Sequence, residues 1–267
     1  MSLIQILVLA LIQGLTEFLP VSSSAHLILG SRLFSWPDQG LVFDVATHLG
    51  TLVAVLFYFR ETIFQMCTAW LRPAKTPLQL EHRSMAKYLV LASIPVILVG
   101  GLAHNWVEAY LRDVRIIAMT TLIFGALLWF ADAFFARDRD LSNMKLKPAL
   151  LIGIAQVLAL IPGTSRSGVT ITMGRMLGFS ADAAARFSFL LAIPVLAAAG
   201  GYGVLRMSLG ESSLDWTQFT LAVVFSAIAG WVCIAAFLAL LKRFGLFPFV
   251  VYRLVLGAAL LYLTIWH

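Results

Sequence analysis

The residues best suited to chemistry lie near the start of the chain, from Gln13 to His26, in the run Q-G-L-T-E-F-L-P-V-S-S-S-A-H. The run is apolar enough to enter a membrane, yet it contains a carboxylate, hydroxyls and a histidine. Gln13 and Glu17 are four residues apart and share one face of a helix that Pro20 would end. A structural polar pair between two helices is the simpler explanation. We favour a function, because an unpaired carboxylate in hydrocarbon costs several kcal/mol.

Three serines stand before the histidine of this run and offer hydroxyl groups close to it. Ser23 is three residues before His26, and a serine beside a histidine can become an activated nucleophile, with Glu17 as a third member. A helix N-cap is the structural alternative for at least one of Ser22, Ser23 and Ser24. Glu17 itself could bind a divalent cation through oxygen or orient the histidine. The spacing permits each of these roles without choosing among them.

A second run, Gln156 to Thr170, repeats this layout as Q-V-L-A-L-I-P-G-T-S-R-S-G-V-T and adds an arginine. Its Pro-Gly turn and hydroxyls stand where a helix should start, so free N–H groups and the helix dipole favour an anion there. Arg166 can grip phosphate oxygens through a bidentate fork. A plain turn with a snorkelling arginine is the alternative. Arg186, which opens the next apolar run, is either a further phosphate ligand or an arginine that sets topology or contacts lipid headgroups.

The composition indicates what kind of scaffold must position these groups. Of the 267 residues, 61% are hydrophobic and 12% are charged, whereas roughly a quarter of the residues in soluble domains are charged. We expect a polytopic membrane protein that forms a single integral domain, residues 1–267. The net charge of +6 comes from residues at the ends of apolar runs, so nucleic acid is not an expected partner. Cys67 and Cys233 have neither disulfide nor zinc spacing.

Two of the apolar segments are broken in the middle, and these two contain the polar runs. Segments 1–34 and 147–178 are interrupted near Pro20 and at Pro162 and Gly163, so neither half reaches the roughly 20 residues of a spanning helix. They predict two re-entrant helical hairpins, which are tolerated only where protein or a watery cavity surrounds them. Six unbroken runs predict spanning helices at about 41–59, 87–104, 115–136, 184–206, 217–241 and 247–266.

The segments that follow the two hairpins also resemble each other. F-D-V-A-T-H-L-G-T-L-V-A-V, from Phe43, corresponds to F-S-F-L-L-A-I-P-V-L-A-A-A, from Phe187. We therefore expect two repeats, about 1–104 and 147–241, followed by a last helix, 247–266. Three full spans separate the hairpins, and this odd number makes the repeats inverted. Inverted-topology repeats with broken helices place a site near the bilayer midplane, where the hairpin tips can meet from opposite faces.

Basic residues gather on one side of this arrangement, which the positive-inside rule makes cytoplasmic. The other side has mainly Arg32, Arg112, Arg115 and Arg206. We therefore expect both termini and the mouth of the first hairpin to face outward. The residues on the basic side are Arg60, Arg72, Lys75, Arg83, Arg137, Arg139, Lys145, Lys147, Lys242 and Arg243.

With E-F-L-P-V-S-S-S-A-H and P-G-T-S-R-S-G-V-T in this order, the chain closely resembles the bacterial undecaprenyl-pyrophosphate phosphatase family, the BacA or UppP type. The resemblance covers essentially the full length and implies the interlocked inverted-repeat fold with two re-entrant hairpins. It implies an inner-membrane enzyme that hydrolyses a polyprenyl diphosphate to the monophosphate and so recycles the carrier lipid of peptidoglycan synthesis. A divalent cation, Mg²⁺ or Ca²⁺, and tolerance of antibiotics that bind the diphosphate carrier are implied as well.

The resemblance also suggests a role for each residue. The family's motifs are Glu or Gln followed by x-x-x-Glu, here Gln13 and Glu17, and P-G-x-S-R-S-x-x-T, here Pro162 to Thr170. Since the first position is Gln13, we treat it as auxiliary, and Glu17 would hold the cation or orient the histidine. Ser23 is the expected nucleophile, chiefly on the resemblance, with His26 as acid or base. The residues expected to hold phosphate are Arg166, Ser22, Gly163, Thr164, Ser165, Ser167, Thr170 and Arg186.

Two alternatives stay open at the level of the sequence. Water could attack the diphosphate directly, which would leave Ser23 as a phosphate ligand. Inverted repeats around a midplane site are also what a secondary transporter or a flippase of a polyprenyl phosphate lipid would show. A transporter, however, has no need for a hydroxyl and a histidine beside an arginine that grips phosphate. The sequence therefore favours a hydrolase that acts on a polyprenyl diphosphate among membrane lipids.

Overall fold

The computed structural model describes residues 1–34, 36, 40–73, 75–111, 113–208 and 215–266. Within these ranges the regular structure is helical, apart from an isolated bridge between Arg139 and Phe179. Six of the described helices are long and apolar enough to cross a membrane. The expected class, an all-α polytopic membrane protein, is therefore confirmed.

The six long helices lie where the unbroken apolar runs predicted them, and most of their ends agree within a few residues. α5 is the exception, because it is longer than expected at both ends. A capping box at Thr76 and Gln79, with Pro77 in the first turn, starts α5 before its apolar part. The six are α3 (Gly40–Tyr58), α5 (Pro77–Tyr110), α6 (Val114–Phe134), α9 (Ala181–Ser208), α10 (Trp216–Phe244) and α11 (Phe247–Trp266).

Both broken segments form a pair of short helices, as the sequence predicted. The first hairpin consists of α1 (Leu3–Glu17) and α2 (Ser23–Leu33). The second consists of α7 (Leu146–Gln156), a 3-10 turn (Val157–Leu160) and α8 (Arg166–Met176). At the second break Gly163 has a φ of +88°, a conformation that glycine adopts without steric cost. The breaks leave backbone groups at the tips without partners in a helix, which is where a polar site can form.

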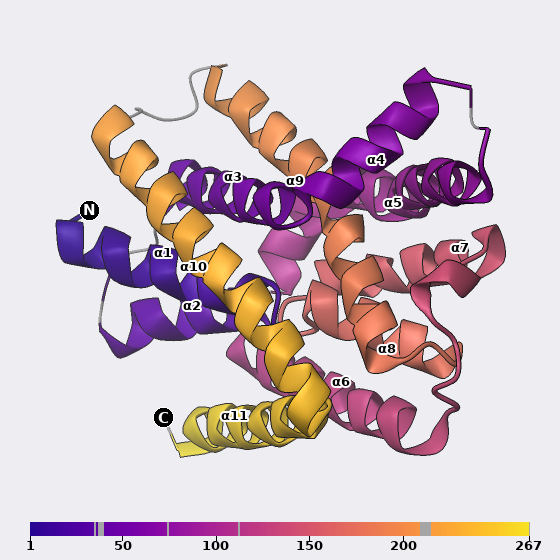
Figure 1. Ribbon diagram of the computed structural model, residues 1–267. Helices are drawn as coiled ribbons and strands as arrows, with labels where there is room; N and C mark the ends of the chain where they lie inside the picture. Colours follow the sequence, from indigo (N-terminus) through magenta and orange to yellow (C-terminus); the bar gives the residue numbers. More distant parts are fainter. Residues whose placement is uncertain (35, 37–39, 74, 112, 209–214, 267) are drawn as a thin grey trace.

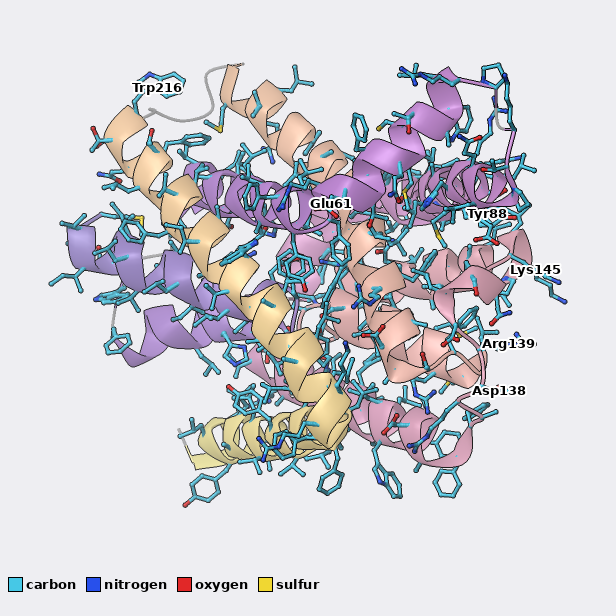
Figure 2. All side chains as sticks on the ribbon, viewed as in Figure 1. Glu61, Tyr88, Asp138, Arg139, Lys145 and Trp216 are labelled. Carbon is cyan, nitrogen blue, oxygen red and sulfur yellow. The ribbon has the colours of Figure 1, made fainter. Side chains whose placement is uncertain are left out.

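The two hairpins reach the middle of the molecule from opposite sides. In Figure 1, α1 starts beside the N-terminus on the left, whereas α7 starts on the right, and the C-terminus at the end of α11 is also on the left. Figure 2 places Arg139 and Lys145 on the right, near the base of the second hairpin. This opposite entry is what inverted repeats require. The boundaries of the repeats themselves stay a prediction.

Long helix α10 crosses the first hairpin and packs on both α1 and α3 (Figure 1). Two glycines allow this close approach: a Cβ at Gly14 of α1 would collide with Ala229, and one at Gly50 of α3 would collide with Ser226. Small residues at such crossings are typical of helix packing in membranes. The largest buried apolar cluster then fills the space between α10, α9 and the end of α1, and includes Phe18, Phe187, Phe189 and Phe237.

A short helix, α4 (Arg60–Leu71), joins α3 to α5, and α11 lies along α6 in the lower part of Figure 1. The long helices thus surround the tips of the two hairpins, where Ser22, Thr164 and Ser167 are buried. Because the hairpin tips are enclosed in this way, their polar groups must find partners within the protein.

Candidate active site

The two hairpin tips are in direct contact inside the helical shell. The hydroxyl of Ser167, in the first turn of α8, donates to the carbonyl oxygen of Leu19 in the first tip at 2.7 Å. α2 and α8 both begin at these tips, so the N–H groups in their first turns lie close to the contact between the two hairpins. Two helix N-termini that meet in this way favour a negatively charged ligand between them.

The two tips also share an unusual local geometry. Ser22 and Ser165 have φ values of 74° and 68°, a left-handed conformation that is uncommon outside glycine. The Ser22 hydroxyl accepts from the Ala25 N–H at 3.4 Å, and the Ser165 hydroxyl accepts from the Gly168 N–H at 3.1 Å. Each serine therefore caps the helix that follows it. Each capping hydroxyl also lies next to the hydroxyl of the serine two residues later, at 3.1 and 3.2 Å, so both serines primarily shape the tips.

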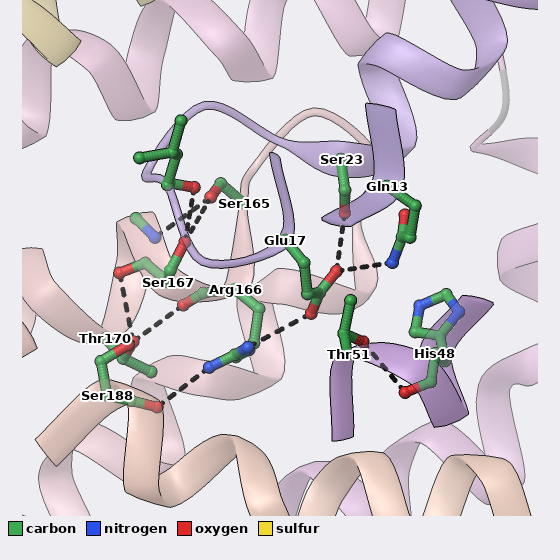
Figure 3. A network of polar contacts seen from close by, with 12 residues as sticks. Gln13, Glu17, Ser23, His48, Thr51, Ser165, Arg166, Ser167, Thr170 and Ser188 are labelled. Carbon is green, nitrogen blue, oxygen red and sulfur yellow. Dashed lines mark hydrogen bonds and ion pairs between the residues drawn. The ribbon is translucent and has the colours of Figure 1, made fainter. Parts of the chain in front are cut away.

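Glu17 is the centre of the polar network between the tips (Figure 3). Its Oε2 accepts from Gln13 Nε2 at 3.0 Å and from the Ser23 hydroxyl at 2.9 Å. Its Oε1 forms an ion pair with Arg166 Nη2 at 3.2 Å. Glu17 is only 8% exposed. The structure thus brings together the carboxylate, the hydroxyl and the arginine that the sequence singled out, with Gln13 as a supporting donor.

Arg166 lies between the first tip and α9. Besides its pair with Glu17, it donates from Nη1 to the carbonyl oxygen of Ser188 at 2.9 Å. Its guanidinium also lies over the ring of Phe18, 6.0 Å from the centroid, a distance at which a cation and an aromatic ring attract. Two of its five N–H groups are therefore engaged within the described residues. The remaining donors can bind an anion without loss of the ion pair.

The remaining hydroxyls of the second tip stabilise the start of α8. Thr170 donates to the carbonyl oxygen of Arg166 at 2.9 Å and lies 2.7 Å from the Ser188 hydroxyl. The Ser167 hydroxyl is 3.2 Å from that of Ser165. The fully buried hydroxyl of Thr164 has no hydrogen-bond partner among the described residues. A buried hydroxyl without a partner is costly, so Thr164 is available to a ligand or to water.

His26 lies to one side of this network. Its Nδ1 is 2.7 Å from the carbonyl oxygen of Ser22, and its Nε2 is 2.6 Å from the hydroxyl of Tyr252 in α11. The two rings are nearly parallel, with an angle of 9° between their planes. The Ser23 hydroxyl is hydrogen-bonded to Glu17 and His26 to Tyr252, so the structure does not join them in one Ser-His-Glu chain.

Arg186, the last candidate from the sequence, and His48, which was not among these candidates, have partners outside the network around Glu17. Arg186, in the first turns of α9, forms an ion pair with Asp182 at 2.7 Å and is partly exposed. His48 is labelled in Figure 3, and its Nδ1 is 2.7 Å from the carbonyl oxygen of Asp44 within α3. The ion pair of Arg186 with Asp182, one turn earlier in α9, is typical of a residue that stabilises the start of a helix.

An apolar cavity of about 570 Å³ adjoins the first tip. It lies between the first hairpin, the end of α10 and the start of α11. Thr16, His26 and Tyr252 are the polar side chains among its lining residues. The lining residues are Thr16, Leu19, Val21, His26, Leu240, Phe244, Pro248, Phe249 and Tyr252. The cavity is suited to an aliphatic chain whose polar end lies at the tips.

The residues at the tips limit how a metal ion could bind. No group of three or more His, Cys, Asp or Glu side chains is placed to hold a metal within the described part of the chain. Glu17 is the carboxylate of the network, and both of its oxygens have partners. One carboxylate fits a cation that takes its other ligands from phosphate oxygens and water, as Mg²⁺ commonly does.

Several residues of this region were not found from the sequence. Arg253 of α11 is buried and contacts both tips. An arginine inside an apolar run is itself a signal of a functional site, so Arg253 could have been singled out in 247–266. Tyr252 and Ser188 carry no such signal, because only the fold brings them to His26 and Arg166.

Comparisons with known proteins agree with these motifs. Residues 6–259 match a family model described as "Bacitracin resistance protein BacA". The chain is 52% identical to "Undecaprenyl-diphosphatase 2" of Stutzerimonas stutzeri, with 98% of each chain covered. It is 50% identical to "Undecaprenyl-diphosphatase" of Saccharophagus degradans, with 100% of this chain and 99% of that protein covered. The matched range includes both hairpins.

Proposed function

The chain belongs to the family of the bacitracin resistance protein BacA, and we propose that it is an undecaprenyl-diphosphatase. It hydrolyses undecaprenyl diphosphate to undecaprenyl phosphate and inorganic phosphate, which returns the carrier lipid to peptidoglycan synthesis. The observation that carries this function is the meeting of Ser23 and Arg166 on Glu17 between the hairpin tips. A serine hydroxyl and an arginine on either side of one carboxylate suit phosphoryl transfer, which depends on the positioning of the reacting groups and on stabilisation of the phosphoryl charge.

The contacts favour Glu17, and not His26, as the base for Ser23. In the first step Ser23 Oγ attacks the terminal phosphorus while Glu17 takes the hydroxyl proton. The bond from that phosphorus to the bridging oxygen breaks, and undecaprenyl phosphate leaves with the electron pair. Water then hydrolyses the phosphoserine, which releases inorganic phosphate and restores the hydroxyl. Arg166 and the N–H groups at the start of α8 would stabilise the charge on the phosphoryl oxygens.

The apolar cavity supports a position for the lipid part of the substrate. The first isoprene units would occupy this cavity, and the rest of the chain would continue into the bilayer between α10 and α11. The lipid-linked phosphate would then lie beside His26, which lines the cavity. In its protonated form His26 would donate to the leaving phosphate from Nε2, which would exchange its contact with Tyr252 for the phosphate. This keeps an acid role for His26 while Glu17 acts on Ser23.

A divalent cation is proposed to enter together with the diphosphate. The single carboxylate of the network supports a site at which Glu17 contributes one ligand and the phosphates and water contribute the others. A bound cation would neutralise charge that develops on the phosphoryl oxygens. The protein residues would still place the substrate, since Arg166 and the α8 N-terminus form an anion site on their own.

We propose the inner membrane as the location, with the site open to the outer face and both termini outside. The support is the separation seen in Figures 1 and 2: both termini lie on one side, and Arg139 and Lys145 on the other. Basic residues mark the cytoplasmic side of membrane proteins. Attachment of a reporter to each terminus would test this orientation.

Phosphate release by the purified protein in detergent tests the function directly. No sealed membrane is present in that assay, so a transporter or flippase would release no phosphate. We expect release from undecaprenyl diphosphate by the wild type, and losses of about 10²-fold or more for Glu17→Gln and Arg166→Gln, as for other groups that stabilise a transition state. Lys145→Gln, at the base of the second hairpin, is the control and should keep wild-type turnover. Absence of release by the folded wild type would exclude the proposed hydrolysis.

A further inference from the structure

A buried arginine of α11 binds both hairpin tips at once. Arg253 is fully buried. Its Nη1 donates to the carbonyl oxygens of Pro20 in the first tip and Thr164 in the second, each at 3.0 Å. Its Nη2 donates to Gly163 at 2.9 Å, and its Nε to Thr121 of α6 at 3.3 Å. One side chain thus connects three segments that are far apart in the sequence.

The charge of Arg253 is not matched by an acid. All four acceptors are neutral carbonyl groups, and no described carboxylate pairs with it. Arg175 offers the contrast: it is also fully buried, but its Nε forms an ion pair with Asp132 at 2.9 Å. A buried charge without a counter-ion is expensive. Arg253 therefore brings positive charge to the place where the diphosphate is proposed to bind, which would offset part of that cost.

The second tip is built to make room for this guanidinium. Gly168 lies in the first turn of α8, and a Cβ at this position would come within 2.8 Å of Arg253 Nη1. The flexible end of the arginine would have to move away from the tips. The space that Gly168 leaves gives a physical reason for the glycine that follows S-R-S in the second run.

We propose that Arg253 is a positioning residue of the phosphatase, which sets the separation and the register of the two tips. Four hydrogen bonds to both tips and to α6 hold them so that Ser23 and Arg166 face the same carboxylate. This inference rests on the proposed function. A misplacement of about 1 Å of reacting groups can cost roughly 10²-fold in rate. Loss of the four hydrogen bonds of the Arg253 guanidinium should therefore lower kcat more than it changes KM.

Arg253→Lys tests this role, with Arg175→Lys as a matched control. Both arginines are fully buried and each makes four hydrogen bonds, but the bonds of Arg175 are at the base of the second hairpin. We expect both variants to lower the unfolding temperature in detergent. Well below that temperature, Arg253→Lys should lose about tenfold or more in kcat, and Arg175→Lys should keep kcat within about twofold of the wild type.

A second variant displaces the guanidinium without removing its charge. Gly168→Ala should lower kcat, as Arg253→Lys should. If Arg253→Lys does not fold, the kcat of Gly168→Ala compared with that of Arg175→Lys tests the inference. The inference is overturned if these variants keep wild-type kcat, or if Arg175→Lys loses as much kcat as Arg253→Lys. Failure of the wild type to release phosphate would contradict the proposed function instead, so the two failures are distinguishable.

Discussion

Glu17 is the residue on which the proposed chemistry of this site depends. It accepts from Gln13 and Ser23 and pairs with Arg166, so one carboxylate connects both hairpins. Its two oxygens have different partners: Oε2 accepts from the Ser23 hydroxyl, and Oε1 pairs with the Arg166 guanidinium. A proton taken from Ser23 would therefore weaken the attraction to Arg166 and free that arginine for the phosphoryl oxygens. In the proposed reaction, nucleophile activation and anion binding would be coupled through this side chain.

Ser23→Ala should abolish most of the turnover if the serine is the nucleophile. We expect a loss of roughly 10³-fold or more, since catalytic nucleophiles act as a unit with their base. Acid quench of the wild-type reaction followed by mass spectrometry should find phosphate on Ser23. Ser24→Ala is the neighbouring control and should lose far less. If Ser23→Ala retains turnover near the wild type, water attacks directly and Ser23 is only a ligand.

The sequence predicted part of this site, and the limit has a physical cause. The pairing of Gln13 with Glu17 follows from helical spacing, and the anion character of Arg166 follows from its neighbours in the chain. The direction of His26 could not be predicted in this way. Its Nδ1 is held by the carbonyl of Ser22, and its Nε2 meets Tyr252 from a helix more than 200 residues later. Contacts of that kind depend on the packing of α11.

At the scale of elements, the hairpin tips are the features that sequence patterns define least well. Pro20 and the Pro162–Gly163 pair predicted where each segment breaks, and each does lie in the gap between two helices. The left-handed conformation at Ser22 and Ser165 was not expected, because serine has no preference for positive φ. The early start of α5 was missed for a related reason: a capping box in a polar turn has no hydrophobic period.

Ser165→Gly should be more stable than Ser165→Ala, although both remove the capping hydroxyl. Loss of an N-cap to alanine costs about 1 kcal/mol, whereas glycine at a cap costs only a few tenths. Glycine also relieves the strain of a φ of 68°, which alanine keeps. Thermal unfolding in detergent should therefore rank the wild type and the glycine variant above the alanine variant. Equal unfolding temperatures for the two variants would show that the backbone at Ser165 is not strained.

For the whole molecule, the two hairpins can be aligned through their tips. Ser22 and Ser165 are 143 residues apart (165 − 22), and the same offset pairs Gln13 with Gln156. Both glutamines are fully buried. The offset also pairs Ser23 with Arg166, two residues that reach the same carboxylate. Corresponding positions thus hold the proposed nucleophile in one hairpin and the phosphate-binding cation in the other.

The carboxylate of Glu17 has no acidic counterpart in the second hairpin. Glu17 aligns with Leu160 and His26 aligns with Val169, so the carboxylate and the imidazole have no counterpart at the same offset in the second hairpin. The apolar cavity is likewise beside the first tip. A nearly symmetric scaffold with unequal side chains would give the proposed substrate one orientation, with its lipid end toward the first hairpin and its terminal phosphate toward the second.

This proposed orientation would make the cavity wall a determinant of substrate affinity and not of the chemical step. Leu240 of α10 lines the cavity and is 44% exposed, so tryptophan can replace it without disturbing the core and would occupy the space of the first isoprene units. We expect Leu240→Trp to raise KM for undecaprenyl diphosphate about tenfold with kcat nearly unchanged, because the variant would weaken binding of the ground state and of the transition state equally. Leu263→Trp is the control, because Leu263 is 43% exposed on α11 and is not among the lining residues. If the two variants have the same KM, the isoprenoid chain leaves the tips by another route, and the position proposed for His26 beside the lipid-linked phosphate is wrong.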